Sequence, residues 1–341
     1  MRLTESGVSS KRTPLAYLAA CPAACLALIL WAIAVGNSWR FFPPDSDCVK
    51  AASLYTEILA VTTIVGEEYN SLTTTLGNFA VKKASEDPIN AALMVRLLKE
   101  AGASTNSVIA INASGSFPGF VLASLSACKA LGLETYVIAS VGSSTYGANV
   151  SGNTIADILL KDDIAKLKFS LLAVTPGGSS DRGSELDHEE LDRVSRMLEK
   201  SGIPFVRPKG LEEAIALRES LFRNCTLLIN IGGSHASSGE DSGLALMSGI
   251  IKANKKKIYK GQGLIQSFLA SQKPVIQILN IRKLYAAYGL EFDKNGTIIR
   301  GKEKLCRWRK IHPAAALIPV LVILVLLAVF RYFGIDKRRK L

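Results

Sequence analysis

Four continuous apolar runs mark the middle of the chain, and each ends in glycine and serine. They cover residues 107–113, 136–139, 171–174 and 227–231, and segments of helical character separate them. Continuous apolar runs are typical of strands buried on both faces, and strands alternating with helices favour a parallel sheet. We therefore predict an α/β fold: a doubly wound, mostly parallel sheet with Gly/Ser-rich loops at the carboxyl ends of its strands.

The segments around these runs carry helix and turn signals. Pro118 suits the first turn of a helix over 118–131, and Thr154 with Asp157 has the spacing of a capping box. A strand over 275–279 and a hairpin turning at Asn295-Gly296 follow. The threonine-rich stretch 69–77 is predicted to be a loop, with a strand or a row of ligand-facing hydroxyls as the alternatives. Further helices are predicted over 46–64, 88–101, 155–161, 187–200, 211–223, 264–271 and up to Tyr288.

Two apolar segments near the ends of the chain are long enough for a bilayer. A helix needs roughly 20 apolar residues, within a range of about 17 to 25, to cross the hydrocarbon core. A cleaved signal peptide is the alternative for the first segment. The predicted organisation is a cytoplasmic tail over 1–14, a transmembrane helix over 15–36, an extracytoplasmic α/β domain over 37–312, a second transmembrane helix over 313–330 and a basic cytoplasmic tail over 331–341.

The positive charge gathers beside the two apolar segments. The chain carries a formal net charge of +12, but the body from 37 to 299 is close to neutral. Basic residues that flank a span favour the cytoplasmic side and attract anionic lipid headgroups. The charge therefore predicts the lipid bilayer as a partner rather than nucleic acid, in a two-pass protein of the cell (inner) membrane.

The six cysteines lack the paired close spacing of zinc or redox sites. Cys21 and Cys25 lie in the first apolar segment. Buried packing is the favoured role for the others, and a disulfide among them is allowed if the domain is extracytoplasmic. These four are Cys48, Cys128, Cys225 and Cys306. No metal site is predicted.

The Gly/Ser-rich loops are the candidate binding site. In open α/β sheets, ligands bind outside the carboxyl ends of the strands, where backbone N–H groups of glycine-rich loops receive carboxylates and phosphates. The candidate ligand-binding residues are Thr74, Ser114, Gly115, Ser116, Ser143, Ser144, Tyr146, Asn149, Gly177, Gly178, Asp181, Gly232, Gly233 and His235. No loop matches a dinucleotide fingerprint or a complete phosphate-binding loop, so no cofactor is predicted.

A hydrolase is the alternative at the same loops. Ser116, Asp181 and His235 occur in the chain order of an α/β-hydrolase triad, with Ser114 as a second candidate nucleophile. No Gly-x-Ser-x-Gly elbow surrounds either serine. Because a triad is defined by geometry, the order of the residues does not assign a reaction.

Taken together, the loop motifs resemble the poly-γ-glutamate system protein family. The motifs are Leu72–Gly77, Ser114–Gly119, Ser140–Asn149, Pro176–Gly183 and Asn230–Gly239, within a resemblance that spans roughly residues 50 to 290. The resemblance implies a bacterial, membrane-anchored component of the machinery that makes and exports poly-γ-glutamate, a capsule polymer. A tryptophan is usual in the family where Tyr146 stands. The resemblance carries no established reaction.

Three hypotheses follow from these observations. In the first, the domain is not an enzyme, and its loops bind the polyanionic polymer or a related small carboxylate beside the membrane components of the synthase. In the second, the protein is an amidohydrolase or transferase that acts on γ-glutamyl amide bonds. In the third, the domain is a scaffold for the synthase complex. The sequence does not give the ligand, the partner subunits or the host.

Overall fold

The structure is a computed structural model that describes residue 31, residues 43–239, 242–254 and 262–307, and residue 324. The chain divides into two units, Pro44–Cys306 and the flanking stretches Met1–Pro43 with Arg307–Leu341. Both predicted membrane segments lie outside the described residues, apart from Trp31 and Leu324. Within the described ranges, no helix is both long and apolar enough to cross a membrane. The fold and the site described below belong to Pro44–Cys306.

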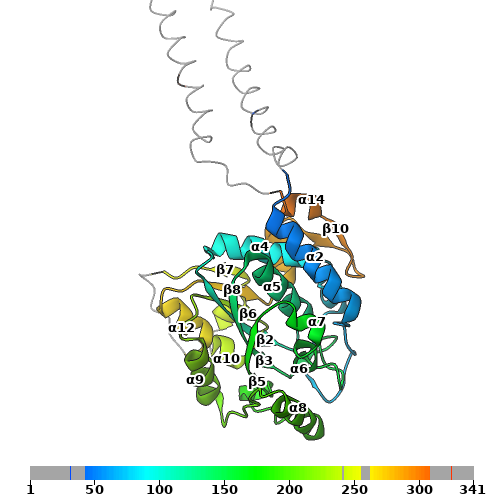
Figure 1. Ribbon diagram of the computed structural model, residues 1–341, viewed down its shortest axis with the longest axis vertical. Coiled ribbons are helices and arrows are strands. Elements are labelled where there is room, and N and C mark those ends of the chain that lie inside the picture. Colours follow the sequence, from blue (N-terminus) through cyan, green and yellow to red (C-terminus); the bar gives the residue numbers. More distant parts are fainter. Residues whose placement is uncertain (1–30, 32–42, 240–241, 255–261, 308–323, 325–341) are drawn as a thin grey trace, which may run out of the picture. The chain divides into compact units, whose positions relative to one another are not determined.

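A six-stranded sheet forms the centre of this domain (Figure 1). Its order is β5-β3-β2-β6-β8-β7; the first five strands run parallel, and β7 pairs antiparallel with β8 at one edge. The strands are β2 (Val108–Ser114), β3 (Glu134–Ser140), β5 (Ser170–Thr175), β6 (Leu227–Ile231), β7 (Gly249–Ile251) and β8 (Val275–Ile278). The predicted α/β class with a mostly parallel sheet is confirmed; the antiparallel edge strand was not predicted.

Helices cover both faces of the sheet, as the continuous apolar strands require. One face packs against α4 (Ile89–Ala101) and α5 (Pro118–Leu131), and α2 (Ser46–Val61) packs on these two helices. The other packs against α9 (Leu211–Phe222) and α12 (Leu264–Ala270). The remaining helices are α3 (Phe79–Ala84), α6 (Ile155–Leu159), α7 (Asp162–Ala165), η2 (Ser179–Asp181), α8 (His188–Lys200), α10 (His235–Ser238), α11 (Ser242–Ala245), α13 (Ile281–Ala287) and α14 (Lys302–Leu305).

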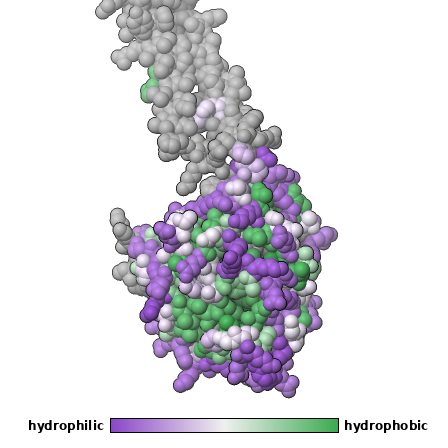
Figure 2. Space-filling view, in the orientation of Figure 1, coloured by the Kyte–Doolittle hydropathy of each residue, from purple (hydrophilic) through white to green (hydrophobic). Residues whose placement is uncertain are grey.

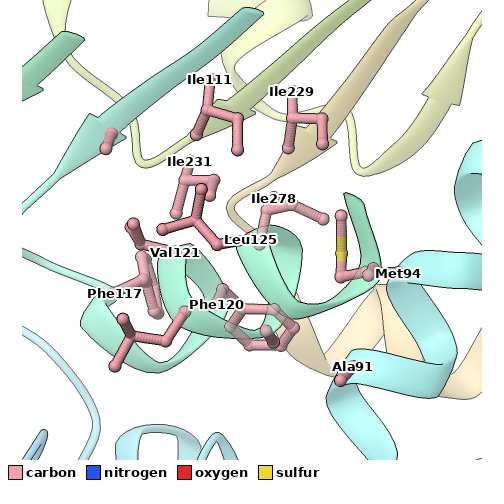
Figure 3. Packing of buried hydrophobic residues seen from close by; sticks show 14 of the residues in the cluster. Ala91, Met94, Ile111, Phe117, Phe120, Val121, Leu125, Ile229, Ile231 and Ile278 are labelled. Carbon is pink, nitrogen blue, oxygen red and sulfur yellow. The ribbon is translucent and has the colours of Figure 1, made fainter. Parts of the chain in front are cut away.

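The largest hydrophobic cluster lies between the sheet and α5. Val121 and Leu125 of α5 point toward Ile111 and Ile229 of the central strands, and Met94 of α4 closes the side of the cluster (Figure 3). Almost every residue of α5 is buried, because α2, α4 and the sheet enclose it. This helix fixes the position of the loop that precedes it, Gly115–Phe117.

Several predicted boundaries need correction. The first helix, α2, ends at Val61 rather than near residue 64, and Asp45 caps it by accepting hydrogen bonds from two backbone N–H groups. Helix α6 stops at Leu159, and a separate turn of helix, α7, follows. The predicted hairpin at Asn295-Gly296 is confirmed by the antiparallel pair β9 (Glu291–Phe292) and β10 (Ile298–Arg300).

The threonine stretch is not a plain loop. Thr73–Thr75 forms β1, which pairs in parallel with β4 (Ser143–Ser144), the segment directly after β3. The side-chain hydroxyl of Thr74 donates to the backbone carbonyl of Ser143 at 3.1 Å. This two-stranded sheet holds the chain from 73 to 84, including α3, against the carboxyl edge of the main sheet.

The surface of the domain is mostly hydrophilic in the orientation of Figure 1, with a group of hydrophobic residues in its lower half (Figure 2). Three exposed hydrophobic residues belong to one stretch of chain: Tyr69, Leu76 and Phe79. Leu76 is 87% exposed. The stretch that bears β1 and α3 therefore presents apolar side chains to solvent on one side and packs on the carboxyl edge with the other.

Candidate functional site at the carboxyl edge of the sheet

A cavity of about 630 Å³ lies at the carboxyl edge of the sheet. The loops after β2, β3, β5 and β6 all contribute to its wall. Two further segments complete it: the chain from Thr74 to Lys82, and Leu279–Arg282 after β8. The prediction that four Gly/Ser-rich loops meet at one pocket is confirmed by this wall.

Most of the predicted ligand-binding residues line the cavity. They are Thr74, Ser114, Ser116, Ser144, Gly177, Gly178, Gly232, Gly233 and His235. The remaining candidates stand outside this lining, and the contacts described below show what they do instead. They are Gly115, Ser143, Tyr146, Asn149 and Asp181.

Lys82 is the buried cation of the cavity, and the sequence did not single it out. Its side chain is 2% exposed, yet it lines the cavity. Its ammonium group donates to the backbone carbonyl of Ser116 and, at 2.7 Å, to the hydroxyl of Ser144. It also lies 3.8 Å from the centre of the Phe117 ring. Among the described residues, no carboxylate forms an ion pair with it.

Burial lowers the pKa of Lys82 to about 7. Taking an ammonium out of water disfavours its charged form, and a nearby carboxylate would offset this cost. The ring and the two oxygen acceptors offset only part of it. Near neutral pH the group is therefore divided between ammonium and amine, and either form has a hydrogen-bonding position left for a ligand.

Local structure explains why Lys82 reaches this position. The side chain of Asn78 caps α3 by accepting a hydrogen bond from the backbone N–H of Val81. The backbone N–H of Gly77 donates to the hydroxyl of Thr145 at 2.6 Å, which fixes the start of the helix on the loop after β4. Lys82 then projects inward, whereas its neighbour Lys83 is exposed and pairs with Glu86.

The serines of the cavity form a hydrogen-bonded set around this lysine. The hydroxyl of Ser114 donates to that of Ser116 at 3.1 Å. The hydroxyl of Ser116 also accepts from the backbone N–H of Ser144 at 3.0 Å. Because Ser144 in turn accepts from Lys82, the loops after β2 and β3 are tied together at the lysine. These hydroxyls can reorient to accept from or donate to a ligand.

Asp181 belongs to a second, closed polar cluster below the cavity. Its carboxylate pairs with the guanidinium of Arg218 at 2.7 Å, and both side chains are almost fully buried. It also accepts from the Thr175 hydroxyl at 2.8 Å and from the backbone N–H of Gly177 at 2.9 Å. Asp181 therefore holds the loop after β5 in place, and both of its carboxylate oxygens already accept hydrogen bonds from within the protein.

Amide side chains extend this cluster across three strands. Arg218 also donates to Asn112 on β2 at 2.9 Å. Asn112 donates to Asn230 on β6, and Asn230 donates to Gln277 on β8, each at 2.7 Å. Asn112, Asn230 and Gln277 are partners in the strand register, so the row follows from the parallel pairing itself. It fixes the strand ends on which the cavity rests.

The other candidates outside the lining support the loops. Asn149 is fully buried, donates to the backbone carbonyl of Glu67 and accepts from the backbone N–H of Glu67, both at 3.0 Å. Ser143 donates to the carbonyl of Gly115 at 2.9 Å. Tyr146 has a left-handed backbone, with φ at 61°, and its ring packs edge-on against Phe79. Their roles in this structure are in loop packing.

The proposed Ser, Asp, His arrangement is not assembled. Ser116 and His235 share the cavity wall, but no hydrogen bond between described residues joins the two side chains. Asp181 is committed to Arg218 and contacts neither. A triad requires the base to bind both the nucleophile and the orienting acid. This structure therefore lends no support to those three residues as a triad.

Further charged groups at the cavity were also missed from the sequence. Arg282 and Glu185 line it with His235, and all three are exposed. Burial acts to raise the pKa of Glu185, but hydrogen bonds from backbone N–H groups, first that of Ser179, outweigh it and lower the pKa. The cavity therefore offers two cationic side chains, Lys82 and Arg282, and the carboxylate of Glu185. The described residues contain no cluster of histidine, cysteine and carboxylate side chains that could hold a metal.

Comparisons with known proteins give no family. No protein-family model matches the chain, and no curated protein matches it. Among solved structures, it is similar to a hydrogen sulfide-producing enzyme from Fusobacterium nucleatum, with 10% identity over 74% of this chain and 90% of that one and a TM-score of 0.21. It is also similar to diaminopropionate ammonia lyase from Escherichia coli, with 12% identity over 70% of this chain and a TM-score of 0.18.

The match covers 61% of the length of the ammonia lyase. A third similar structure is a pyridoxal 5′-phosphate-dependent aspartate racemase, with 10% identity over 80% of this chain and 94% of that one and a TM-score of 0.18. Scores this low carry no argument about the fold or the chemistry of this chain.

Proposed function

We propose that this protein is a membrane-anchored component of a poly-γ-glutamate synthesis or export system, and that its cavity binds the polymer or a related carboxylate. The loop motifs that resemble the family and the apolar segments at 15–36 and 313–330 support the first part. The cavity chemistry supports the second. Its partners are then the bilayer and the membrane components of the synthase.

One observation carries the ligand assignment: Lys82 is a buried cation without an acidic partner among the described residues. A buried ammonium is costly unless an anion or several hydrogen bonds compensate it. A ligand carboxylate that reaches Lys82 supplies the missing anion. The Gly/Ser-rich loops add backbone N–H groups and hydroxyls, which suit a carboxylate better than an apolar ligand.

The rim of the cavity suits a chain that carries an acid on every unit. Arg282 and His235 lie at the rim with Glu185. In a γ-linked glutamate chain each unit has one free carboxylate and one amide, so a carboxylate at Lys82 leaves the carboxylates of neighbouring units for Arg282 and His235, which can donate hydrogen bonds to them. Glu185 is disfavoured as a contact for a carboxylate and suits the amide N–H groups between them.

Binding of oligo-γ-glutamate to the full-length protein in detergent tests this function. We expect saturable binding that weakens with added salt, and a loss of roughly 10- to 100-fold in affinity for Lys82→Met, the size of one charged hydrogen bond. Lys83→Met is the matched control, since it removes an identical charge one residue away from an exposed site and should bind as the wild type does. Equal affinity in Lys82→Met and Lys83→Met contradicts the assignment.

The affinity for oligo-α-glutamate of the same length shows whether the site recognises the γ-linkage or only the number of carboxylates. It carries the same number of carboxylates on longer side chains, so the spacing along the chain differs. A preference for the γ-linked oligomer supports the polymer assignment. Equal affinity for both would reduce the proposal to a general carboxylate site.

The amine form of Lys82 favours a second candidate, an enzyme. A buried lysine with its pKa lowered to about 7 is a nucleophile or a general base at neutral pH. As a nucleophile, its nitrogen would add to the carbonyl carbon of a ligand, and loss of the carbonyl oxygen as water would leave an imine. As a base, it would take a proton from a hydroxyl or a water that attacks a γ-glutamyl amide.

Reductive trapping distinguishes this candidate from simple binding. Pyridoxal 5′-phosphate serves as a probe because it joins an aldehyde to an anionic group. After borohydride reduction, peptide mapping should place the label on Lys82 in preference to the exposed lysines, and Lys82→Met should abolish that label while Lys83→Met keeps it. Label spread evenly over surface lysines, together with no release of product from the polymer, would rule the enzyme out.

A further inference from the structure

The two ends of the domain meet at a pair of cysteines. Cys48 lies in the first turn of α2, and Cys306 follows directly after α14, at the end of the unit Pro44–Cys306. Although about 260 residues separate them, both pack in the same hydrophobic cluster, and the side chain of Cys306 is close enough to that of Cys48 to raise the pKa of its thiol. The Cys48 thiol also donates to the backbone carbonyl of Ala92 at 3.6 Å. Sequence spacing gave no sign of this pair.

Backbone contacts hold the two cysteines near each other. The backbone N–H of Asp45 donates to the carbonyl of Cys306 at 2.6 Å. The carboxylate of the same aspartate accepts from the backbone N–H of Cys48 at 3.3 Å and pairs with Lys99 at 2.7 Å. Asp45 therefore contacts the backbone of both cysteines. A second contact holds α14, because Lys302 in its first turn pairs with Asp87. The two cysteines are thus held near each other by the backbone contacts of one residue, Asp45.

We propose that Cys48 and Cys306 form an intramolecular disulfide that closes the domain at its two ends. The other described cysteines do not form such a pair. Cys128 lies on α5 in the interior, and Cys225 belongs to the hydrophobic cluster on the opposite face of the sheet. The pairing depends on the junction of the chain ends and is independent of the ligand proposed for the cavity.

The chemistry is a two-step exchange with an oxidised dithiol or a small disulfide as the oxidant. Cys306 is half-buried whereas Cys48 is fully buried, so Cys306 is the sulfur that the oxidant reaches. The Cys306 thiolate attacks the oxidant disulfide and one thiolate leaves. Cys48 then loses its proton and attacks the Cys306 sulfur, and the second thiolate leaves. The protein loses two protons and two electrons, and the oxidant disulfide is reduced to two thiols.

The second step is expected to be slow near neutral pH. The hydrogen bond with Cys306 and burial both raise the pKa of Cys48 well above its ordinary value. Because the thiolate is the attacking species, closure of the disulfide should accelerate as the pH rises. Oxidising compartments favour such bonds, and the extracytoplasmic placement proposed for this domain provides one.

The bond should stabilise the domain through its unfolded state. A cross-link between residues so far apart removes many conformations from the unfolded chain. We expect the oxidised protein to unfold at a temperature roughly 5–10 °C above that of the reduced protein. The two ends of the domain would then stay together even when its interior loosens.

Peptide mapping of the full-length protein in detergent tests the proposal. After incubation with oxidised glutathione at pH 8.5 and blocking of remaining thiols, a peptide pair linked through Cys48 and Cys306 is expected. Cys128→Ser and Cys225→Ser should keep the linked pair and the rise in unfolding temperature. Cys48→Ser should abolish both and leave Cys306 as a glutathione adduct.

Two results would overturn the proposal. One is recovery of Cys48 and Cys306 as separate blocked thiols after the oxidation. The other is a linked pair with the same yield in urea, where the folded junction is absent. A variant that fails to fold is recognised by its circular dichroism, and Cys48→Ala, which keeps a small apolar side chain, then replaces Cys48→Ser.

Discussion

Two buried cations lie near the same edge of the sheet, and their charges are compensated in different ways. Arg218 is fully buried, pairs with Asp181 at 2.7 Å and donates to Asn112, Ser140 and Thr175. Lys82 is almost as buried but has no carboxylate among the described residues, only a hydroxyl, a backbone carbonyl and a ring. Arg218 is neutralised by a carboxylate of the protein itself. Lys82 can still accept a carboxylate from a ligand.

The difference distinguishes a buried charge that stabilises the fold from one that can bind a ligand, by whether its partners all belong to the protein. A buried charge whose partners are all internal needs no ligand, and removing it breaks the network. A buried charge whose compensation is incomplete costs stability in the free protein, a pattern that is frequent at functional sites.

The largest effect is expected from Arg218→Met. It leaves the Asp181 carboxylate buried without its cation, and truncating one partner of a buried ion pair costs about 3–5 kcal/mol. Chemical denaturation should report this loss in the free energy of unfolding. The double variant Arg218→Met with Asp181→Leu should recover part of it. A loss below about 1 kcal/mol for the single variant would contradict a structural role for this cation.

The second prediction concerns pH. The pKa of Lys82 is lowered in the folded protein, so between pH 7 and about 10.5 the unfolded chain binds more protons than the folded one. The free energy of unfolding should therefore rise with pH across that window, by roughly 2–4 kcal/mol for this group. Lys82→Met should lack that rise, and below pH 7 it should gain relative to the wild type. Parallel stability curves for the two proteins would argue against a costly Lys82 charge.

The third prediction concerns Ser144. Ser144→Ala removes the hydroxyl that accepts from Lys82 at 2.7 Å, which favours the ammonium by about 1 kcal/mol. The pKa of Lys82 should fall further, and the pH dependence of its acylation, followed by peptide mapping, measures this. Ser143→Ala is the matched control: its hydroxyl donates to Gly115 and does not contact Lys82, so the titration should stay in place.

The smallest effect is expected from Lys83→Met. Lys83 is exposed and pairs with Glu86 at the surface, where ion pairs contribute about 0–1 kcal/mol. Its free energy of unfolding and its affinity for oligo-γ-glutamate should match those of the wild type within error. A change as large as that of Lys82→Met would mean that the net charge of α3, rather than the buried site, governs binding.

The sheet and its crossover helices followed well from the sequence. Strands such as Leu227–Ile231 are buried along their whole length, so their apolar runs are continuous and easily recognised. Capping signals such as Thr154 with Asp157 act locally, and the structure confirms that capping box. Features that depend on distant partners did not follow. The antiparallel strand β7 is short and carries no local signal, and β1 exists only because it pairs with β4.

The site could be predicted from the sequence only in part, because some of its residues depend on distant partners. The glycine and serine loops line the cavity because the carboxyl ends of parallel strands must meet at one edge. Lys82 was missed because α3 has only six residues, too few for a period that separates its buried lysine from the exposed one beside it. Asp181 was taken for a ligand-binding or catalytic acid because its buried partner, Arg218, lies on a helix much later in the chain.

The enclosure of α5 divides the cavity into a fixed wall and an adjustable one. The loop before α5 is anchored by a helix buried on every side, whereas the segment with α3 is attached through a sheet of only two short strands. The segment with α3 is therefore the less firmly attached part of the wall, and it carries Lys82, whose ammonium lies 3.8 Å from the centre of the Phe117 ring. We expect a ligand that displaces α3 to change the burial of Lys82, and burial is what lowers the pKa of this lysine.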